Sequence, residues 1–165
     1  MIKKLLLIAA LALPMLLSAQ TFKVGLVDMN DIFEKLPETT AAQNSLAETN
    51  KKYEAEMQRI DEELQRQYEE LQKMDENEPA AIKERKARQV QETQQKREAF
   101  YQSAMQDLQK QQQELTAPIF QKIQSAIESV GKENGFSLIQ ELQSVQFFAA
   151  PVEDITPLVK AKLGL

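Results

Sequence analysis

Two long segments without glycine constrain the fold of this chain more than any other feature. They run from residue 39 to 74 and from Pro79 up to Gly131, and both are rich in Gln, Glu, Lys, Arg and Ala. This composition strongly favours helix. Only residues 75–79 separate the two segments, a connection that allows little but an antiparallel helical hairpin. The sequence therefore predicts a hairpin arm over residues 38–115 with its tip at 75–79.

The two helices of the arm differ in their apolar pattern. The outgoing helix has large apolar residues at heptad-like spacing, whereas residues 91–99 of the return helix have none. Such helices pair along a narrow seam and are otherwise exposed. The candidates for this seam, or for a client-facing surface of the arm, are Tyr53, Met57, Ile60, Leu64, Tyr68, Leu71, Met74, Phe100, Tyr101 and Met105. For most of Tyr53, Met57, Tyr68 and Met74 the seam is favoured over an adaptable surface for many clients.

A β-type run at residues 22–27 precedes the arm. Asp28 or Asn30 is expected to cap a short helix after this run, and Pro37 is expected to end that helix. The long outgoing helix is then expected to begin at Thr39 or Thr40.

The chain after the arm returns to a mixed pattern. Gly131 and Gly135 are expected to terminate the return helix. Residues 136–140 and 145–149 are then predicted to be two strands, paired as a hairpin, in one small sheet with residues 22–27.

The last segment is predicted to be a short helix. Asp154 or Thr156 would cap it, with Pro157 in its first turn and Leu158, Val159 and Leu163 facing inward.

Residues 20–37 and 116–165 together are predicted to form a small β-rich body. A core of this size supplies only a few kcal/mol of stability by itself. Self-association of the bodies is therefore expected, and the predicted fold class is α+β, mostly α, with the helical hairpin projecting from an oligomerisation body.

The N-terminus has the pattern of a secretory signal peptide over residues 1–19. Lys3 and Lys4 precede an apolar run at residues 5–17, and small residues precede a cleavage site near 19/20. The run is short for a membrane span, so an uncleaved anchor is the less favoured alternative. The sequence has no cysteine, which excludes disulfides and a lipidated cysteine. A soluble protein of the periplasm is the simplest interpretation.

The composition argues against catalysis and against nucleic-acid binding. The sequence has no His or Cys, and none of its four glycines form a phosphate-binding loop. Asp28 and Asp31 resemble a carboxylate pair, but a helix cap explains Asp28 better. A net charge of −5 disfavours phosphate contacts. We therefore predict no enzyme activity, no catalytic residues, no cofactor, no metal and no nucleic-acid partner.

The order of these parts resembles the Skp/OmpH family of periplasmic chaperones over nearly the whole chain after the signal peptide. The matching pieces are residues 23–28, Pro37-Glu38 before Ala41-Ala42-Gln43 and Leu46, Ala117-Pro118-Ile119 with Lys122-Ile123 and Ala126-Ile127, Glu133-Asn134-Gly135-Phe136 with Leu138-Ile139, and Asp154-Ile155-Thr156.

The resemblance implies a jellyfish-like homotrimer whose helical tentacles enclose a cavity. It implies an ATP-independent holdase that binds unfolded outer-membrane β-barrel proteins and prevents their aggregation, with the hairpin lining the cavity. By the same comparison the trimer body would contain Val24, Leu26, Ile139, Val145 and Phe147. The alternative from a different class is an envelope structural or adaptor coiled coil that binds one folded partner.

The charge of the arm departs from the family pattern. Family members are known for strongly basic tentacles, whereas residues 48–78 here have 11 acidic and 5 basic side chains, and residues 83–114 have 5 acidic and 7 basic. The basic residues form a local cluster near the tip, made of Lys83, Arg85, Lys86 and Arg88. This balance argues against contact with a membrane surface.

Overall fold

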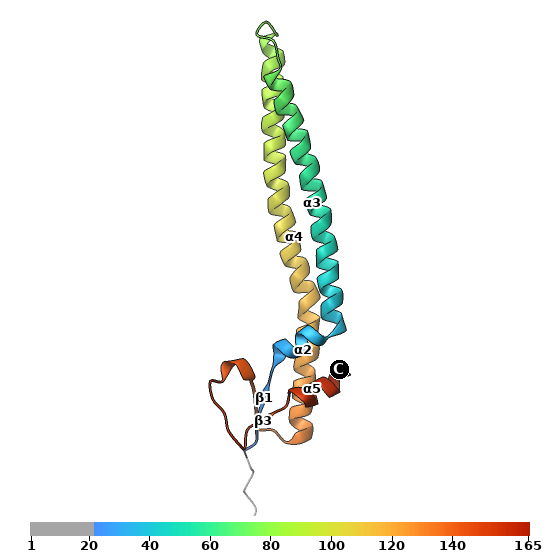
Figure 1. The fold of residues 1–165 in the computed structure, drawn as a ribbon, viewed down its shortest axis with the longest axis vertical. Helices are drawn as coiled ribbons and strands as arrows, with labels where there is room; N and C mark the ends of the chain where they lie inside the picture. Colours follow the sequence, from blue (N-terminus) through green and yellow to red (C-terminus); the bar gives the residue numbers. More distant parts are fainter. Residues whose placement is uncertain (1–21) are drawn as a thin grey trace, which may run out of the picture. The chain divides into compact units, whose positions relative to one another are not determined.

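The computed structural model describes residues 22–165 and is mostly helical, with one small sheet (Figure 1). The elements in chain order are β1 (Val24–Val27), α2 (Met29–Lys35), α3 (Pro37–Gln72), α4 (Ala80–Asn134), β2 (Leu138–Glu141), a 3-10 turn (Leu142–Ser144), β3 (Glu153–Asp154) and α5 (Thr156–Leu163). The predicted fold class, α+β and mostly α with a long helical hairpin, is confirmed. The predicted signal peptide at residues 1–19 lies outside the described residues.

The described chain divides into two compact units. The sheet unit comprises the described residues up to Ile32 together with Ser125–Leu165, and the hairpin unit comprises Phe33–Gln124.

Helices α3 and α4 run antiparallel in the hairpin unit (Figure 1). Polar contacts between them pair residues at increasing distance from the tip, from Lys86 with Glu70 to Lys122 with Glu38. Apolar residues form the seam between these pairs, and the buried ones are Ala42, Ile60, Val90, Ala104, Ile119 and Ile123. The seam is narrow because each helix buries only one stripe of residues.

The start of α3 differs from the prediction. Pro37 begins this helix, whereas we expected it to end the preceding one, with α3 beginning at Thr39 or Thr40. Proline fits the first helical position because its fixed φ is helical and its missing N–H would have no intrahelical acceptor there. The extended residue Leu36 separates α2 from α3, with φ −71° and ψ 131°.

The sheet is entirely parallel, in the order β2-β1-β3. Val24 pairs with Leu138 on one side of β1, and Leu26 pairs with Asp154 on the other. The predicted hairpin of residues 136–140 and 145–149 is therefore wrong. The 3-10 turn follows β2 directly, residues 145–149 lie in no strand, and β3 supplies the third strand. The predicted hairpin would have paired residues 145–149 with β2, but the 3-10 turn Leu142–Ser144 occupies the connection that a hairpin turn would need.

Two glycines were expected to terminate α4, and one of them does so. Gly135 ends α4 with φ +69°, and Phe136 N–H donates to the Gly131 carbonyl at 3.0 Å, so this end of the helix is as expected. Gly131 does not terminate α4 but lies buried inside it. A Cβ at Gly131 would lie 2.9 Å from Cδ1 of Ile139, so the small residue allows β2 to approach the helix closely.

The buried residues of α5 lie in one stripe, which begins at Ile155, the residue directly before the helix. Ile155 and Val159 are fully buried, and Leu163 is partly buried one turn further on. Leu158 is exposed, which corrects the prediction that it faces inward, because it lies about 100° around the helix from Val159. Pro157 occupies the first turn, as expected.

Candidate functional site

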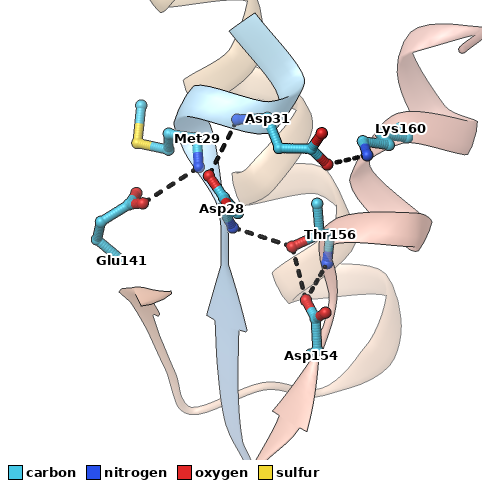
Figure 2. Close-up of polar contacts among 7 residues, drawn as sticks. All are labelled: Asp28, Met29, Asp31, Glu141, Asp154, Thr156 and Lys160. Carbon is cyan, nitrogen blue, oxygen red and sulfur yellow. Dashed lines mark hydrogen bonds and ion pairs between the residues drawn. The ribbon is translucent and has the colours of Figure 1, made fainter. Parts of the chain in front are cut away.

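The carboxylates that follow β1 are structural (Figure 2). Asp28 accepts the N–H of Asp31 at 2.9 Å and so caps α2, as the sequence indicated. The N–H of Asp28 donates to Thr156 Oγ1 at 2.9 Å, and that hydroxyl donates to Asp154 at 2.6 Å. Lys160 forms an ion pair with Asp31. These hydrogen bonds and this ion pair attach α2 and α5 to the sheet. Asp28 therefore acts as a helix cap, and Asp31 acts as the ion-pair partner of Lys160.

An apolar groove lies along the hairpin unit. Its volume is about 760 Å³. The apolar side chains of its floor are Tyr53, Met57, Phe100, Tyr101, Ala104, Met105 and Leu108. The polar side chains that border them are Asn50, Glu54, Gln58, Asp61, Glu62, Gln65, Arg66 and Glu69. We call this feature the arm groove.

The arm groove continues into a second hollow along the same two helices. This hollow measures about 670 Å³ and shares Asn50, Met105 and Leu108 with the arm groove. Its remaining lining is mostly glutamine and alanine, with Leu46 as the large apolar residue. The arm therefore offers an elongated surface, which suits a flexible chain better than a compact small molecule.

The floor of the arm groove is held by an aromatic pair. The rings of Tyr53 and Phe100 meet edge to face with centroids 5.9 Å apart, a favoured aromatic geometry. The hydroxyl of Tyr53 donates to Asp107 at 2.5 Å. This hydrogen bond raises the pKa of Tyr53 above its usual value, because the nearby carboxylate stabilises the protonated phenol. Beside this pair, Tyr101 and Met105 are 48% and 51% exposed.

Polar contacts hold the two helices together where large apolar residues are absent from α4. Gln94 donates to the hydroxyl of Tyr68, and Arg97 pairs with Asp61. The hydrogen bond that Arg97 donates to Asp61 raises the pKa of Arg97. Gln67 is buried in this stretch, and its amide donates to Glu63 at 2.7 Å. The stretch at residues 91–99 is therefore bridged by side-chain hydrogen bonds, and this polar seam borders the arm groove.

The predicted arm residues divide into three sets. Ile60 is buried in the seam at 3% exposure. The arm groove brings together Tyr53, Met57, Phe100, Tyr101 and Met105. The others lie nearer the tip and outside that groove: Leu64, Tyr68, Leu71 and Met74. Binding of a client by any of these residues stays a prediction.

Sequence reasoning missed the contributions of Leu108 and Ala104 to the groove. Both lie one helical turn from residues that were identified, since Ala104 follows Phe100 at a spacing of four and Leu108 follows Met105 at a spacing of three. That spacing is the signal that could have found them. A small residue at 104 also leaves room above the seam that a larger side chain would fill.

Most of the predicted basic tip cluster is engaged within the hairpin. Lys83 donates to the Glu76 carbonyl at 2.8 Å, and Lys86 pairs with Glu70 across the two helices. The Lys86 hydrogen bond lowers the pKa of Glu70. Arg88 pairs with Glu84 one turn earlier, and Arg85 is exposed. Three of the four basic side chains therefore have hydrogen-bond or ion-pair partners within the hairpin.

The residues predicted for a trimer body all lie in the sheet unit, but their side chains differ in solvent exposure. Leu26 is buried in that unit's own core. Val24, Ile139 and Val145 are partly exposed, and Phe147 is 83% exposed. Other exposed large apolar residues of this unit are Phe22, Leu138, Phe148, Leu158 and Leu165.

Among residues 22–165, no group of three or more acidic side chains is placed to hold a metal ion. In the same part of the chain, no helix is both long enough and apolar enough to cross a membrane.

Comparison with known families decides the relationship. The family model described as outer membrane protein (OmpH-like) matches residues 23–163, from the start of the sheet unit to the last turn of α5. The chain belongs to the OmpH-like family. The match covers the hairpin as well as both pieces of the sheet unit, so the groove-bearing arm is part of the shared architecture.

Individual relatives agree with this assignment. The Chaperone protein Skp of Escherichia coli (strain K12) is 29% identical over 158 residues, covering 93% of this chain and 94% of the relative. The Chaperone protein Skp of Salmonella typhimurium (strain LT2) is 28% identical over 155 residues, with the same coverage of both chains. The resemblance to the Skp/OmpH family stated from the sequence is confirmed.

Proposed function

We propose that this chain is an ATP-independent periplasmic holdase that binds unfolded outer-membrane β-barrel precursors and prevents their aggregation. The observation that carries the proposal is the arm groove, an elongated apolar surface on a long two-helix hairpin. Its OmpH-like relatives are named chaperones, which supports a chaperone role for this member.

The chemistry of the groove suits many weak contacts with a flexible client. Met57 and Met105 have unbranched, polarisable side chains that adapt to different partners. Tyr101 offers a large rigid surface with little side-chain entropy to lose on binding. Each contact alone exchanges quickly, and several arms around one client raise the effective concentration so that the sum is tight.

Avidity requires more than one arm around the client, and we propose a homotrimer assembled through the sheet unit. The body would comprise residues 20–37 and 116–165, with the arm at 38–115. Exposed Phe147, Phe148 and Leu138 support this, because a small unit with several exposed large apolar side chains gains stability by covering them. The contact residues would then include Val24, Ile139, Val145 and Phe147.

We propose that the mature protein resides in the periplasm after removal of residues 1–19. The n-region lysines and the apolar run of 5–17 support export across the inner membrane. Substitution of Lys3 and Lys4 by Glu would slow export, and the precursor would then accumulate in the cytoplasm as a larger species on a denaturing gel.

Turbidity of a diluted, urea-unfolded β-barrel protein tests the holdase directly. The full mature chain is expected to suppress aggregation. Tyr101→Ser combined with Met105→Ser should weaken suppression, since both side chains are exposed in the arm groove. Gln91→Ser with Gln95→Ser is the matched control, because both side chains are exposed on the same helix and lie outside the groove lining. Unchanged turbidity with the natural chain would refute the proposal.

The adaptor alternative predicts one folded partner. A photoreactive residue at Phe100 would then crosslink to a single folded protein, whereas a holdase would crosslink to many unfolded chains. The polar seam at residues 91–99 favours the holdase, because specific docking of a coiled coil requires sustained apolar heptads.

A further inference from the structure

The border of the arm groove is acidic on one side. Its lining includes the carboxylates of Glu54, Asp61, Glu62 and Glu69, against the single guanidinium of Arg66. All five of these residues belong to α3, whereas α4 contributes uncharged side chains to the lining. An occupant of the groove therefore meets apolar groups on its floor and a row of carboxylates along one edge.

Not all of this charge is neutralised within the chain. Arg97 pairs with Asp61, Lys73 lies 3.6 Å from Glu69, and Arg66 pairs with Glu63, which is outside the groove lining.

Two of the carboxylates have amide partners only. Asn50 donates to Glu54 at 2.7 Å, and Gln58 donates to Glu62 at 2.9 Å. Among residues 22–165, neither Glu54 nor Glu62 forms an ion pair. Each amide belongs to the helical turn before its carboxylate, so it fixes the carboxylate at the groove border and leaves the negative charge in place.

We propose that the arm groove selects unfolded polypeptide segments in which Lys or Arg side chains lie among apolar residues. This inference rests on the proposed holdase function and names the chemistry of the client segment. Glu54 and Glu62 are two helical turns apart, about 12 Å along the axis. Two basic residues four apart in an extended chain are separated by about 13 Å, so both can reach the carboxylates together.

The floor of the groove suits the same segment. The aliphatic stem of Lys or Arg packs on apolar surface while its charged end remains at the solvated border. Met57 lies on α3 between Glu54 and Glu62 and supplies such a surface. The exposed ring of Tyr101 adds a face that attracts cations. An acidic segment would meet like charge along the same edge and bind less tightly.

Binding of matched peptides to the full mature chain tests this selection. Three short peptides share the same apolar residues and carry two Lys, two Gln or two Glu four residues apart, and fluorescence anisotropy gives their dissociation constants. The Lys peptide should bind roughly fivefold to tenfold more tightly than the Glu peptide, as expected for two solvated ion pairs. The difference should shrink as salt rises from about 0.05 M to about 0.5 M.

Variants separate a local effect from net charge. Glu54→Gln with Glu62→Gln should remove the preference for the Lys peptide. Glu48→Gln with Glu92→Gln changes the net charge equally at exposed positions outside the groove lining and should retain the preference. Tyr101→Ser should weaken all three peptides, and the Lys peptide most, because the ring supplies both apolar surface and a face that attracts cations. Equal binding of the Lys and Glu peptides, or equal effects of the two double variants, would overturn the proposal.

The outcome is distinguishable from that of the holdase proposal. A chain that suppresses aggregation of an unfolded barrel but binds the three peptides equally refutes the charge preference alone. A chain that prefers the Lys peptide but leaves barrel aggregation unchanged supports the groove chemistry and refutes the holdase function.

Discussion

Substitution of Thr156 gives the sharpest test of the hydrogen bonds that hold the sheet unit together. Its side-chain oxygen accepts the N–H of Asp28 from the end of β1 and donates to Asp154 from the end of β3. Asp28 and Thr156 are 128 positions apart in the chain, and Thr156 is only 5% exposed. Figure 2 shows the hydroxyl between the two partners. Thr156→Val keeps the shape of the side chain and removes both hydrogen bonds.

The expected loss of stability follows from the groups left behind. The Asp28 N–H would lose its acceptor in a partly buried position, which costs about 1–3 kcal/mol. The Asp154 carboxylate keeps the backbone N–H of Thr156 at 2.9 Å, so it is not left unpaired. We therefore expect Thr156→Val to destabilise the sheet unit by about 2 kcal/mol. Thr156→Ser keeps the oxygen and removes one methyl, so it should cost about 0.8 kcal/mol or less.

Amide hydrogen exchange measures this effect locally. A loss of about 2 kcal/mol corresponds to roughly thirtyfold less protection of the β1 and β3 amides. Protection of the hairpin amides near Ile60 serves as the internal reference, and protein concentration is held constant because self-association also affects stability. If Thr156→Val matched the natural chain, or were better protected than Thr156→Ser, the assigned role of the hydroxyl would be wrong.

Three further predictions follow from the hairpin and from the end of α4. Asp107→Asn should lower the pKa of Tyr53 toward its usual value of 10.0, because the charged acceptor is lost, and absorbance titration of the tyrosines would detect the shift in a chain without tryptophan. The raised pKa of Tyr53 implies stability that is present at neutral pH and is lost as the phenol ionises above its folded pKa, so alkaline unfolding should begin at lower pH in Asp107→Asn. Ile60→Ala should cost about 2–4 kcal/mol by removing a buried seam side chain, seen as a lower urea midpoint of helical circular dichroism, and an unchanged midpoint would contradict its burial. Gly135→Ala should lower the free energy of unfolding by about 1–2 kcal/mol. The cause is backbone strain at the positive φ of 69° alone, because no atom lies within 4 Å of the added Cβ. A thermal midpoint equal to that of the natural chain would refute this strain.

The hairpin could be predicted from sequence because its evidence is local. Helix-forming composition and the short break at residues 75–79 do not depend on distant partners. The start of α3 was misplaced because Pro37 fits either the end of one helix or the first turn of the next, and the sequence alone does not distinguish them. The Asp28 cap was identified because its partner is three residues away.

The sheet could not be predicted in the same way because its pairing is non-local. Residues 145–149 have the β-branched and aromatic composition of a strand, but the 3-10 turn at residues 142–144 takes the place of the hairpin turn that would pair them with β2. The two-residue strand β3 has no pattern of its own, and only its pairing with Gly25 and Leu26 defines it. The groove was found in part, since its aromatic and methionine residues stood out while Ala104 did not. A cavity depends on which side chains are small, and that is visible only once facing residues are known.

The parallel sheet has a consequence for the order in which the chain folds. Strand β1 lies near the start of the described chain, yet both of its partners come from the last 28 residues, Leu138–Leu165. Closing a flexible loop of more than a hundred residues carries an entropic penalty. A preformed hairpin reduces that penalty, because Glu38 and Lys122 meet at its base and the intervening residues no longer act as a free loop. The arm can therefore fold as soon as it is synthesised, whereas the sheet must wait for the final residues, and a chain truncated after Asn134 would leave β1 without a neighbour on either edge.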